Sequence, residues 1–463
     1  MKVYTERLGT APLGKLLIAL SLPGIVSSIT TTLYNVVDTF WVAQLGHQAI
    51  AALTIVFPYQ IIMYAIGGGT GIGVSALVSR RFGERNVEET NRIAGQILIV
   101  SAFWGLLFIL AASFFAGDIV RLIGATPDII EYARQYLLIV SYGAPLVIFG
   151  IIFGSLVRGS GDAVKPMIIM ITGTVINIIL DPLMILGIGP FPEMGVKGAA
   201  LATVIAQGGG VLICFYYFFR QKTAFHVRFK QLRPDTRIIK DVYRVGAPAS
   251  ILQITESFAF MLFDKVLSTF GSMAIAAAGI AFRISDFAFM PVLGVSHGLL
   301  PVVGFCCGER NFKRLWRALK LASLGIVALL LVITSLIEIF APQIVSIFSK
   351  DTALIPVTVP AMRIMLSSMP LIGPSIMFVT AFQGLNKGKT ALGLSLIRQF
   401  IVFVPLMYLF RHLFGMFGVW WSLPVSDTLG ITVSLGFIFR EYRLHQKSGV
   451  MALEAAPNSQ AQV

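Results

Sequence analysis

The chain has 463 residues, of which 56% are hydrophobic and only 13% are charged, and its mean hydropathy is +0.83. A soluble domain carries about 25% charged residues, so this composition excludes a soluble protein and predicts a polytopic all-α membrane protein with apolar runs long enough to span a bilayer. The net charge of +14 comes from Lys and Arg residues scattered through the loops, which argues against nucleic-acid binding and is typical of cytoplasmic loops.

Apolar runs of membrane-spanning length divide the chain into twelve predicted helices. A polar leader (1–14) precedes them, a basic linker (220–240) follows the sixth, and a polar tail (441–463), which we expect to be disordered, follows the twelfth. The linker separates an N-terminal lobe (15–219) from a C-terminal lobe (241–440). The spans are predicted at about 15–44, 49–79, 93–116, 129–157, 164–189, 196–219, 241–270, 274–305, 316–341, 354–383, 389–413 and 418–440.

The Lys and Arg residues predict the orientation of these spans. If the N-terminus is cytoplasmic, the cytoplasmic segments hold 26 of the 36 basic residues and the outer segments hold 6. Because positive residues concentrate on the cytoplasmic side, we expect both termini to be cytoplasmic and the protein to lie in the cell membrane, which is the inner membrane where a cell has two. We expect a monomer in the lipid bilayer.

The two lobes repeat one another at a constant offset in residue number. The offset maps Pro23 onto Pro248, and it maps the turn Gly83–Asn86 onto Gly308–Asn311. Near span six the offset becomes shorter by two and maps Gly195 onto Gly418. Six spans is an even number, so the lobes enter from the same side and are predicted to be two six-helix bundles related by a pseudo-two-fold axis along the membrane normal. This architecture is typical of transporters.

Span one carries a polar stripe that includes an acid. Ser27, Thr31, Tyr34 and Asp38 share one helical face, with Asn35 beside Tyr34. A charge in the bilayer costs roughly 3 kcal/mol on insertion scales unless it faces protein groups or water. We therefore predict that the stripe lines a cavity and that Asp38 holds an ion or a proton, the alternative being a structural bond between helices.

Span five places a second acid at a similar depth. Thr174, Asn177 and Asp181 share a face just before Pro182. Asp38 and Asp181 could share a proton, or could bind a sodium ion together with Asn177 and a hydroxyl such as that of Thr203 in span six. The alternative is that Asp181 only satisfies backbone groups freed by the proline.

The C-terminal lobe offers a separate set of polar residues. Gln253, Glu256 and Asp264 lie on one face of span seven, and Glu256 is the best candidate to meet a cationic substrate. Arg283 and Asp286 in span eight are spaced to form an ion pair. Arg398 in span eleven would neutralise one of these acids. The candidates predicted to serve substrate recognition, or else to be structural, are Gln253, Glu256, Asp264, Asp286 and Arg398.

No enzymatic or cofactor motif is visible. Gly67–Gly71 is glycine-rich, but it lacks the lysine of a phosphate loop and lies within an apolar span. The sequence has no metal cluster and no nucleophile triad. We therefore predict a protein that is not an enzyme, that needs no cofactor, and that uses a gradient of H⁺ or Na⁺ if it transports uphill.

The chain resembles the prokaryotic multidrug and toxic compound extrusion (MATE) family of cation-coupled antiporters across all twelve spans. The motifs that carry the resemblance are Ser21-Leu22-Pro23, the Asp38 stretch with Leu45-Gly46, Gly83–Asn86, Arg158–Asp162, Asn177–Pro182, Gly195–Thr203 and Gln383-Gly384. The resemblance implies two six-helix bundles around a cleft that opens alternately to the two sides of the membrane.

The resemblance also implies roles for particular residues. It implies a first-lobe cation site at Asp38, Asn177, Asp181 and Thr203, with bending of span one at Pro23. Glu256 matches a glutamate of the sodium-coupled and eukaryotic branches. The sodium-coupled members also use an aspartate in span ten, where this chain reads Ser368-Met369-Pro370-Leu371. This departure favours coupling in the first lobe.

These observations predict a secondary antiporter that exports small amphipathic, often cationic, organic compounds in exchange for H⁺ or Na⁺. One alternative is a flippase for a lipid-linked saccharide, which would need a cationic cleft built from Arg283, Arg363 and Arg398. A second alternative is a non-transporting membrane receptor or scaffold, against which the two-lobe repeat with its intramembrane acids argues.

Overall fold

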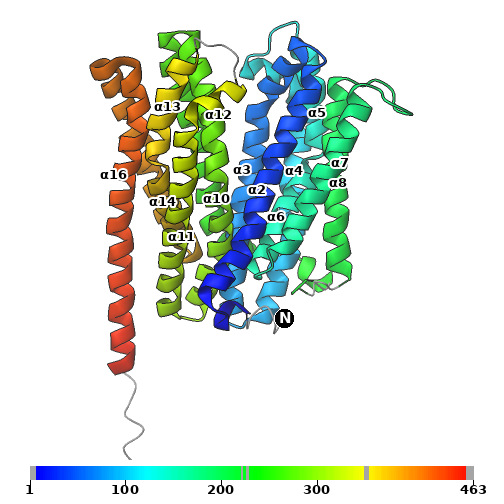
Figure 1. Cartoon of the computed structure of the whole chain (residues 1–463). Helices are drawn as coiled ribbons and strands as arrows, with labels where there is room; N and C mark the ends of the chain where they lie inside the picture. Colours follow the sequence, from blue (N-terminus) through cyan, green and yellow to red (C-terminus); the bar gives the residue numbers. More distant parts are fainter. Residues whose placement is uncertain (1–6, 221–222, 226–228, 349–353, 455–463) are drawn as a thin grey trace, which may run out of the picture. The chain divides into compact units, whose positions relative to one another are not determined.

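The computed structural model describes residues 7–220, 223–225, 229–348 and 354–454, and the described residues are almost entirely helical (Figure 1). The long helices alternate with short turns, as expected of a chain whose apolar runs each satisfy their own backbone groups in lipid. The elements are α2 (Leu13–Ala43), α3 (His47–Gly83), α4 (Val87–Ile123), α5 (Ile130–Tyr142), α6 (Ala144–Gly159), α7 (Val164–Ile185), α8 (Val196–Phe219), η1 (Phe229–Leu232), α9 (Thr236–Leu267), η2 (Ser268–Phe270), α10 (Ser272–Gly308), α11 (Phe312–Ile339), α12 (Ala341–Phe348), α13 (Ile355–Ser367), α14 (Met369–Gly384), α15 (Gly388–Leu396), η3 (Ile397–Phe403) and α16 (Val404–Glu454).

The described helices account for the twelve predicted spans. Nine continuous helical stretches are long and apolar enough to cross a membrane, and two further spans are bent pairs, α5 with α6 at 49° and α13 with α14 at 41°. The ninth stretch, Gly388–Lys447, contains two spans because Gly415 has non-helical backbone angles (φ 62°, ψ −141°) and breaks the helix there. Short α12 lies between spans nine and ten.

The chain forms two compact units. Unit 1 comprises residues 1–260, 289–309 and 380–392, and unit 2 comprises residues 261–288, 310–379 and 393–463. Unit 1 therefore contains the whole predicted N-terminal lobe together with one end of each of spans seven, eight, ten and eleven. These ends lie next to the connections that we predict to be cytoplasmic.

Backbone geometry repeats at the offset that maps Pro23 onto Pro248. Gly46 ends span one with φ 100° and ψ 177°, and Gly271 ends span seven with φ 98° and ψ 172°. Arg85 and Arg310 are non-glycine residues in the left-handed region, with φ 58° and φ 57°. Because a residue other than glycine rarely adopts positive φ, this paired feature shows that the two halves share one backbone design.

The predicted offset near span six is wrong. Gly195 precedes α8 with φ 54° and ψ −129°, and the residue with matching angles before span twelve is Gly415 rather than Gly418. A Cβ at Gly198 or at Gly418 would lie 2.3 Å or 2.1 Å from a carbonyl of the preceding span, so these two glycines are also equivalent. The offset is smaller here because the connection between spans eleven and twelve is shorter than the loop 186–195 between spans five and six.

Glycines hold α3 against α9 within unit 1. A Cβ at Gly73 would lie 2.2 Å from the Val242 carbonyl oxygen and 3.0 Å from the Gly246 nitrogen, so the two helices touch through their backbones. Small residues allow this close approach between spans.

The same contact occurs a second time in unit 1, between α2 and α10. A Cβ at Gly298 would lie 2.9 Å from the Ser21 nitrogen. The offset that maps Pro23 onto Pro248 also maps Gly73 onto Gly298 and Ser21 onto Gly246. The repeat therefore builds one helix-to-helix contact twice, and we call the two contacts together the glycine seam.

Candidate functional site

The predicted polar stripe of span one divides into two parts in the structure. Pro23 lies inside α2, where its ring removes one backbone hydrogen bond. The Ser27 hydroxyl donates to the Pro23 carbonyl at 2.8 Å, and the Thr31 hydroxyl donates to the Ser27 carbonyl at 3.0 Å. Hydroxyls that bond back to the preceding turn tend to bend helices. This half of the stripe therefore serves the helix itself, next to its proline.

The second half of the stripe meets other helices. The hydroxyls of Tyr34 in α2 and Thr203 in α8 lie 3.1 Å apart and form a hydrogen bond. One turn later, Asp38 has a carboxylate oxygen, Oδ1, that is buried without a hydrogen-bond partner. Asn35 is exposed and is not brought into this group.

The Asp38 charge acts on three tyrosines, and two of them were not among the predicted site residues. Besides Tyr34, the Asp38 charge acts on the hydroxyls of Tyr64 in α3 and Tyr136 in α5. Tyrosines in apolar spans usually only fill space, so spacing alone could not have indicated these two.

The α7 pair is fully buried. Asn177 and Asp181 are both 0% exposed, and the Asn177 amide nitrogen donates to Asp181 Oδ1 at 2.9 Å. Their remaining oxygens, Asn177 Oδ1 and Asp181 Oδ2, have no hydrogen-bond partner. The hydrogen-bond partner of Asp181 is thus a side chain one turn back, and not the backbone near Pro182. Asp181 also interacts electrostatically with Asp38.

The first bundle therefore gathers oxygen atoms that lack a positive partner. Three buried acceptors, one each from Asp38, Asn177 and Asp181, make no hydrogen bond. Buried polar atoms are almost always satisfied, and such exceptions call for an explanation. Oxygen ligands suit a proton or a hard monovalent cation. Among the described residues no group of three or more His, Cys, Asp or Glu side chains could hold a metal ion.

The predicted C-terminal candidates are not brought together into one cluster. Gln253 and Glu256 are half-buried on the part of α9 in unit 1, and Gln253 lies against Gly68 of α3. Asp264 and Asp286 are exposed residues of unit 2. Arg283 is also exposed and makes no ion pair with Asp286 in the described structure, so the predicted pairing on α10 is wrong.

Arg398 neutralises an acid that the sequence prediction missed. Its Nη1 donates to Asp427 Oδ1 at 2.9 Å, and the Ser368 hydroxyl donates to Asp427 Oδ2 at 2.8 Å. The available signal was the same one that identified Asp38: a carboxylate in the middle of an apolar span, here between Ser426 and Thr428.

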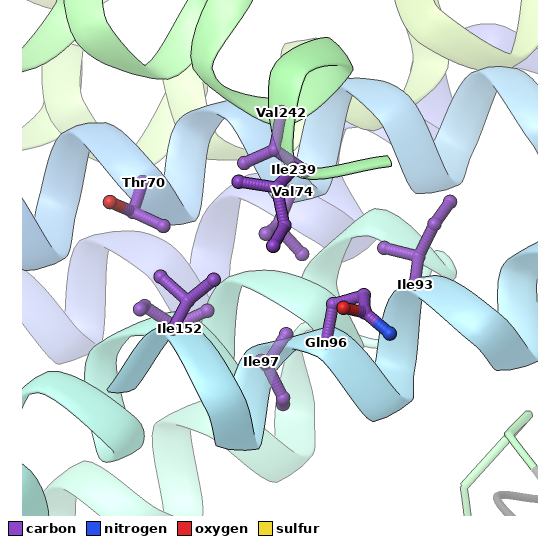
Figure 2. A pocket seen from close by; sticks show the side chains of 9 residues that line it. Thr70, Val74, Ile93, Gln96, Ile97, Ile152, Ile239 and Val242 are labelled. Atoms are coloured by element: carbon purple, nitrogen blue, oxygen red, sulfur yellow. The ribbon is translucent and has the colours of Figure 1, made fainter. Parts of the chain in front are cut away.

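The internal cavity drawn in Figure 2 is too small for an organic substrate. It has a volume of about 10 Å³, which is room for one water molecule at most. It lies among α3, α4, α6 and the start of α9, and mostly apolar side chains surround it: Thr70, Val74, Ile93, Gln96, Ile97, Val100, Ile152, Ile239 and Val242.

Known proteins match this chain over most of its length. The MatE family model matches residues 23–183 and 248–409. The multidrug export protein MepA of Staphylococcus saprophyticus is 26% identical over 414 residues, covering 88% of this chain and 90% of MepA. One similar solved structure, at 28% identity, is described as the outward-facing conformation of a multidrug resistance MATE family transporter; its TM-score is 0.90, and 95% of this chain and 98% of that chain are covered.

A second solved structure is equally similar but is described differently. It is a transporter of Pyrococcus furiosus whose reverse polarity of the binding pocket is said to suggest a different function, with 28% identity, a TM-score of 0.89, and coverage of 95% of this chain and 98% of that one. The family match, the twelve described spans and the repeat agree on two bundles of six helices. This chain belongs to the MATE family of prokaryotic membrane transporters and is not an enzyme.

Proposed function

We propose that this protein is a secondary antiporter that exports small amphipathic, often cationic, organic compounds in exchange for inward H⁺ or Na⁺. It would act in the cell membrane as a monomer with both termini in the cytoplasm. The names of its relatives support the substrate class, since MepA is described as a multidrug export protein. The distribution of Lys and Arg supports the orientation.

The observation that carries the proposal is the group of unpartnered oxygens in the first bundle. Asp38, Asn177 and Asp181 each keep a buried acceptor atom without a hydrogen bond. Two carboxylates that interact in a medium of low dielectric constant repel each other when both are charged. A proton or a sodium ion would relieve this repulsion. The Thr203 hydroxyl bonds to Tyr34, on which the Asp38 charge acts.

Cation binding would act on α2, which supplies both Asp38 and Tyr34. The helix already lacks one backbone hydrogen bond at Pro23, and hydroxyls bond back to its carbonyls on the next turn. A cation held between α2 and α7 would favour the arrangement of α2 that brings the Asp38 oxygens closest to those of Asn177 and Asp181. A ligand shifts such an equilibrium by its difference in affinity for the two states, so loading and release would bias the transporter between its two orientations.

The contacts of the arginines argue against the flippase. An anionic head group would need unpaired positive charge, but Arg398 is bound to Asp427 at 2.9 Å. Arg363 lies 3.8 Å from the Glu338 carboxylate. Of the three arginines that could build a cationic cleft, two are already next to acids.

The test is ethidium efflux from vesicles under separately imposed pH and sodium gradients. We expect wild type to export under at least one gradient, which names the coupling ion, and we expect Asp38→Asn to lose gradient-driven export. Asp118→Asn is the matched control, because Asp118 is an exposed acid of α4 outside every candidate site and its neutralisation should leave export intact.

Three results would count against the proposal. Undiminished export by folded Asp38→Asn would show that the first-bundle carboxylates do not couple transport. Absence of efflux by folded wild type under either gradient would point to a narrow substrate range or to the flippase. Absence of any substrate-dependent ion flux in liposomes would support the non-transporting alternative.

A further inference from the structure

Unit 2 contains a buried charge centre that the proposed coupling site does not use. The Asp427 carboxylate, whose side chain is 7% exposed, accepts one hydrogen bond at each oxygen, from Arg398 at 2.9 Å and from Ser368 at 2.8 Å. The Arg398 side chain is only 16% exposed. Ionised groups inside spans are costly and are functional by default, so this centre calls for a role.

Two spans of this centre, eleven and twelve, correspond to spans five and six of the first-bundle site. Arg398 lies in span eleven, Asp427 in span twelve, and Ser368 at the break between the two helices of span ten. In the first bundle the corresponding spans are five, which carries Asp181, and six, which carries Thr203, with span four broken between α5 and α6. The acids themselves lie on different spans: the first bundle carries them on spans one and five, and the second carries Asp427 on span twelve, the counterpart of span six.

In the second bundle an apolar cluster occupies the position that corresponds to Asp38. At the offset that maps Pro23 onto Pro248, Asp38 corresponds to Phe263, which is 0% exposed. Its ring packs against three other aromatic rings at centroid distances of 5.3 to 6.0 Å; they belong to Phe282, Phe403 and Trp420. A second carboxylate is therefore not available at this position to share a cation with Asp427.

The local backbone positions the guanidinium. Arg398 belongs to the π-helical segment η3, and such segments are rare and frequently occur at functional sites. The absence of a side chain at Gly430, on α16, leaves room for the arginine stem: a Cβ there would lie 2.7 Å from Arg398 Cγ. Both features bring the charged end of Arg398 to Asp427.

We propose that Arg398 is a tethered cation that occupies the Asp427 carboxylate and prevents the second bundle from binding a coupling ion. The first-bundle carboxylates alone would then set the ratio of ions to substrate, an inference that rests on the proposed function. Without the guanidinium, the oxygens of Asp427 and Ser368 form a latent site for a proton or a sodium ion.

The test counts cations bound to the purified full-length protein. Binding of radioactive sodium at alkaline pH and proton uptake measured with a pH-sensitive dye are compared for wild type and Arg398→Met, which keeps an apolar stem but removes the charge. We expect the variant to bind one more monovalent cation per protein than wild type. Arg398→Met/Asp427→Asn should return to the wild-type number, and Arg283→Met, at an exposed arginine of α10, should not change it.

An unchanged number of bound cations in folded Arg398→Met would overturn the inference. So would a gain that persists in the double variant, because the extra cation would then not be at Asp427. If Arg398→Met does not fold, Asp427→Asn alone decides: the wild-type number supports the tethered cation, and the loss of one cation shows that Asp427 binds a coupling ion already.

The same measurement separates this inference from the proposed function. Asp38→Asn is included, and we expect it to bind fewer cations than wild type. If Asp38→Asn keeps the wild-type number while Arg398→Met gains one, the first-bundle proposal fails and the role of Arg398 stands. If Asp38→Asn loses a cation and Arg398→Met gains none, the first-bundle proposal stands and the proposed role of Arg398 fails.

Discussion

The two bundles place different chemistry on the same spans of a repeated backbone. In the first, Asp38 and Asp181 keep oxygens without a partner. In the second, Phe263 takes the place of Asp38 in an aromatic cluster, and Asp427 is bound by Arg398. Duplication has preserved the frame, down to the angles of Gly46 and Gly271, while the charges have diverged.

The difference concerns where each acid finds its positive partner. An ion pair within the protein is satisfied in every state that keeps the pair together, so it gives no reason to prefer one state. Acids that need a partner from solution make the stability of each state depend on that partner. On our proposal the first bundle therefore responds to an ion gradient, and the second remains constant.

Neutralising the first-bundle acids should have the largest effect. We expect Asp38→Asn and Asp181→Asn each to abolish gradient-driven efflux, and we expect the double variant to be no worse than either, because residues that act as a unit are not additive. Transport assays in vesicles, with expression and folding checked, measure this. Partial losses that add up in the double variant would show that the two acids act independently.

Making the second bundle resemble the first should destabilise it. Phe263→Asp places a carboxylate in a fully buried aromatic cluster without a partner, at a cost of about 3–5 kcal/mol. Phe263→Leu, which keeps the site apolar, is the matched control. Thermal unfolding in detergent should show a much lower midpoint for the aspartate variant, and similar midpoints for both would mean that the cluster admits water.

Removing one partner of the Arg398–Asp427 pair should lower the free energy of unfolding by about as much as Phe263→Asp does, or slightly less. Asp427→Leu leaves a mostly buried guanidinium without its carboxylate, which is expected to cost about 3 kcal/mol or more. Replacing both partners, as Arg398→Met/Asp427→Leu, should recover most of the loss, since an apolar pair needs no partner. A double variant as unstable as the single one would contradict this account. Thermal unfolding measures all three proteins.

The smallest expected effect is the loss of a single tyrosine hydrogen bond. Comparing two such losses separates an effect on ion binding from an effect on stability alone. Tyr34→Phe removes the 3.1 Å bond to Thr203, and Tyr59→Phe removes a 2.8 Å bond to Ser141 elsewhere in unit 1. Each should cost about 1 kcal/mol of stability. Only Tyr34→Phe should weaken sodium or proton binding, which a titration of efflux against the ion measures. Equal effects on ion binding would remove Tyr34 from the site.

Most of the fold could be predicted from local signals. Apolar runs located all twelve spans, because each span satisfies its own backbone and needs no long-range partner to be recognised. The register of span twelve could not be predicted in this way. Gly195-Val196 and Gly418-Val419 are alike in sequence, but backbone angles pair Gly195 with Gly415.

The candidate site was predictable only where charge marked it. Asp38, Asn177 and Asp181 stood out as polar groups on helical faces within apolar spans. Tyr64 and Tyr136 did not, because the effect of the Asp38 charge on them depends on how helices distant in sequence pack together. The cavity along the stripe stays a prediction; in the structure the Ser27 and Thr31 hydroxyls bond to their own helix.

The glycine seam has a consequence for how tolerant the chain is of mutation. Glycine has no rotamers to lose, so Gly73 and Gly298 themselves lose no side-chain entropy where the helices meet. The same contact leaves no space for even one methyl group, since a Cβ at Gly73 would lie 2.2 Å from a carbonyl oxygen. A contact that loses no side-chain entropy at its glycines is thus among the least forgiving of substitution, and the repeat has given the chain two such contacts.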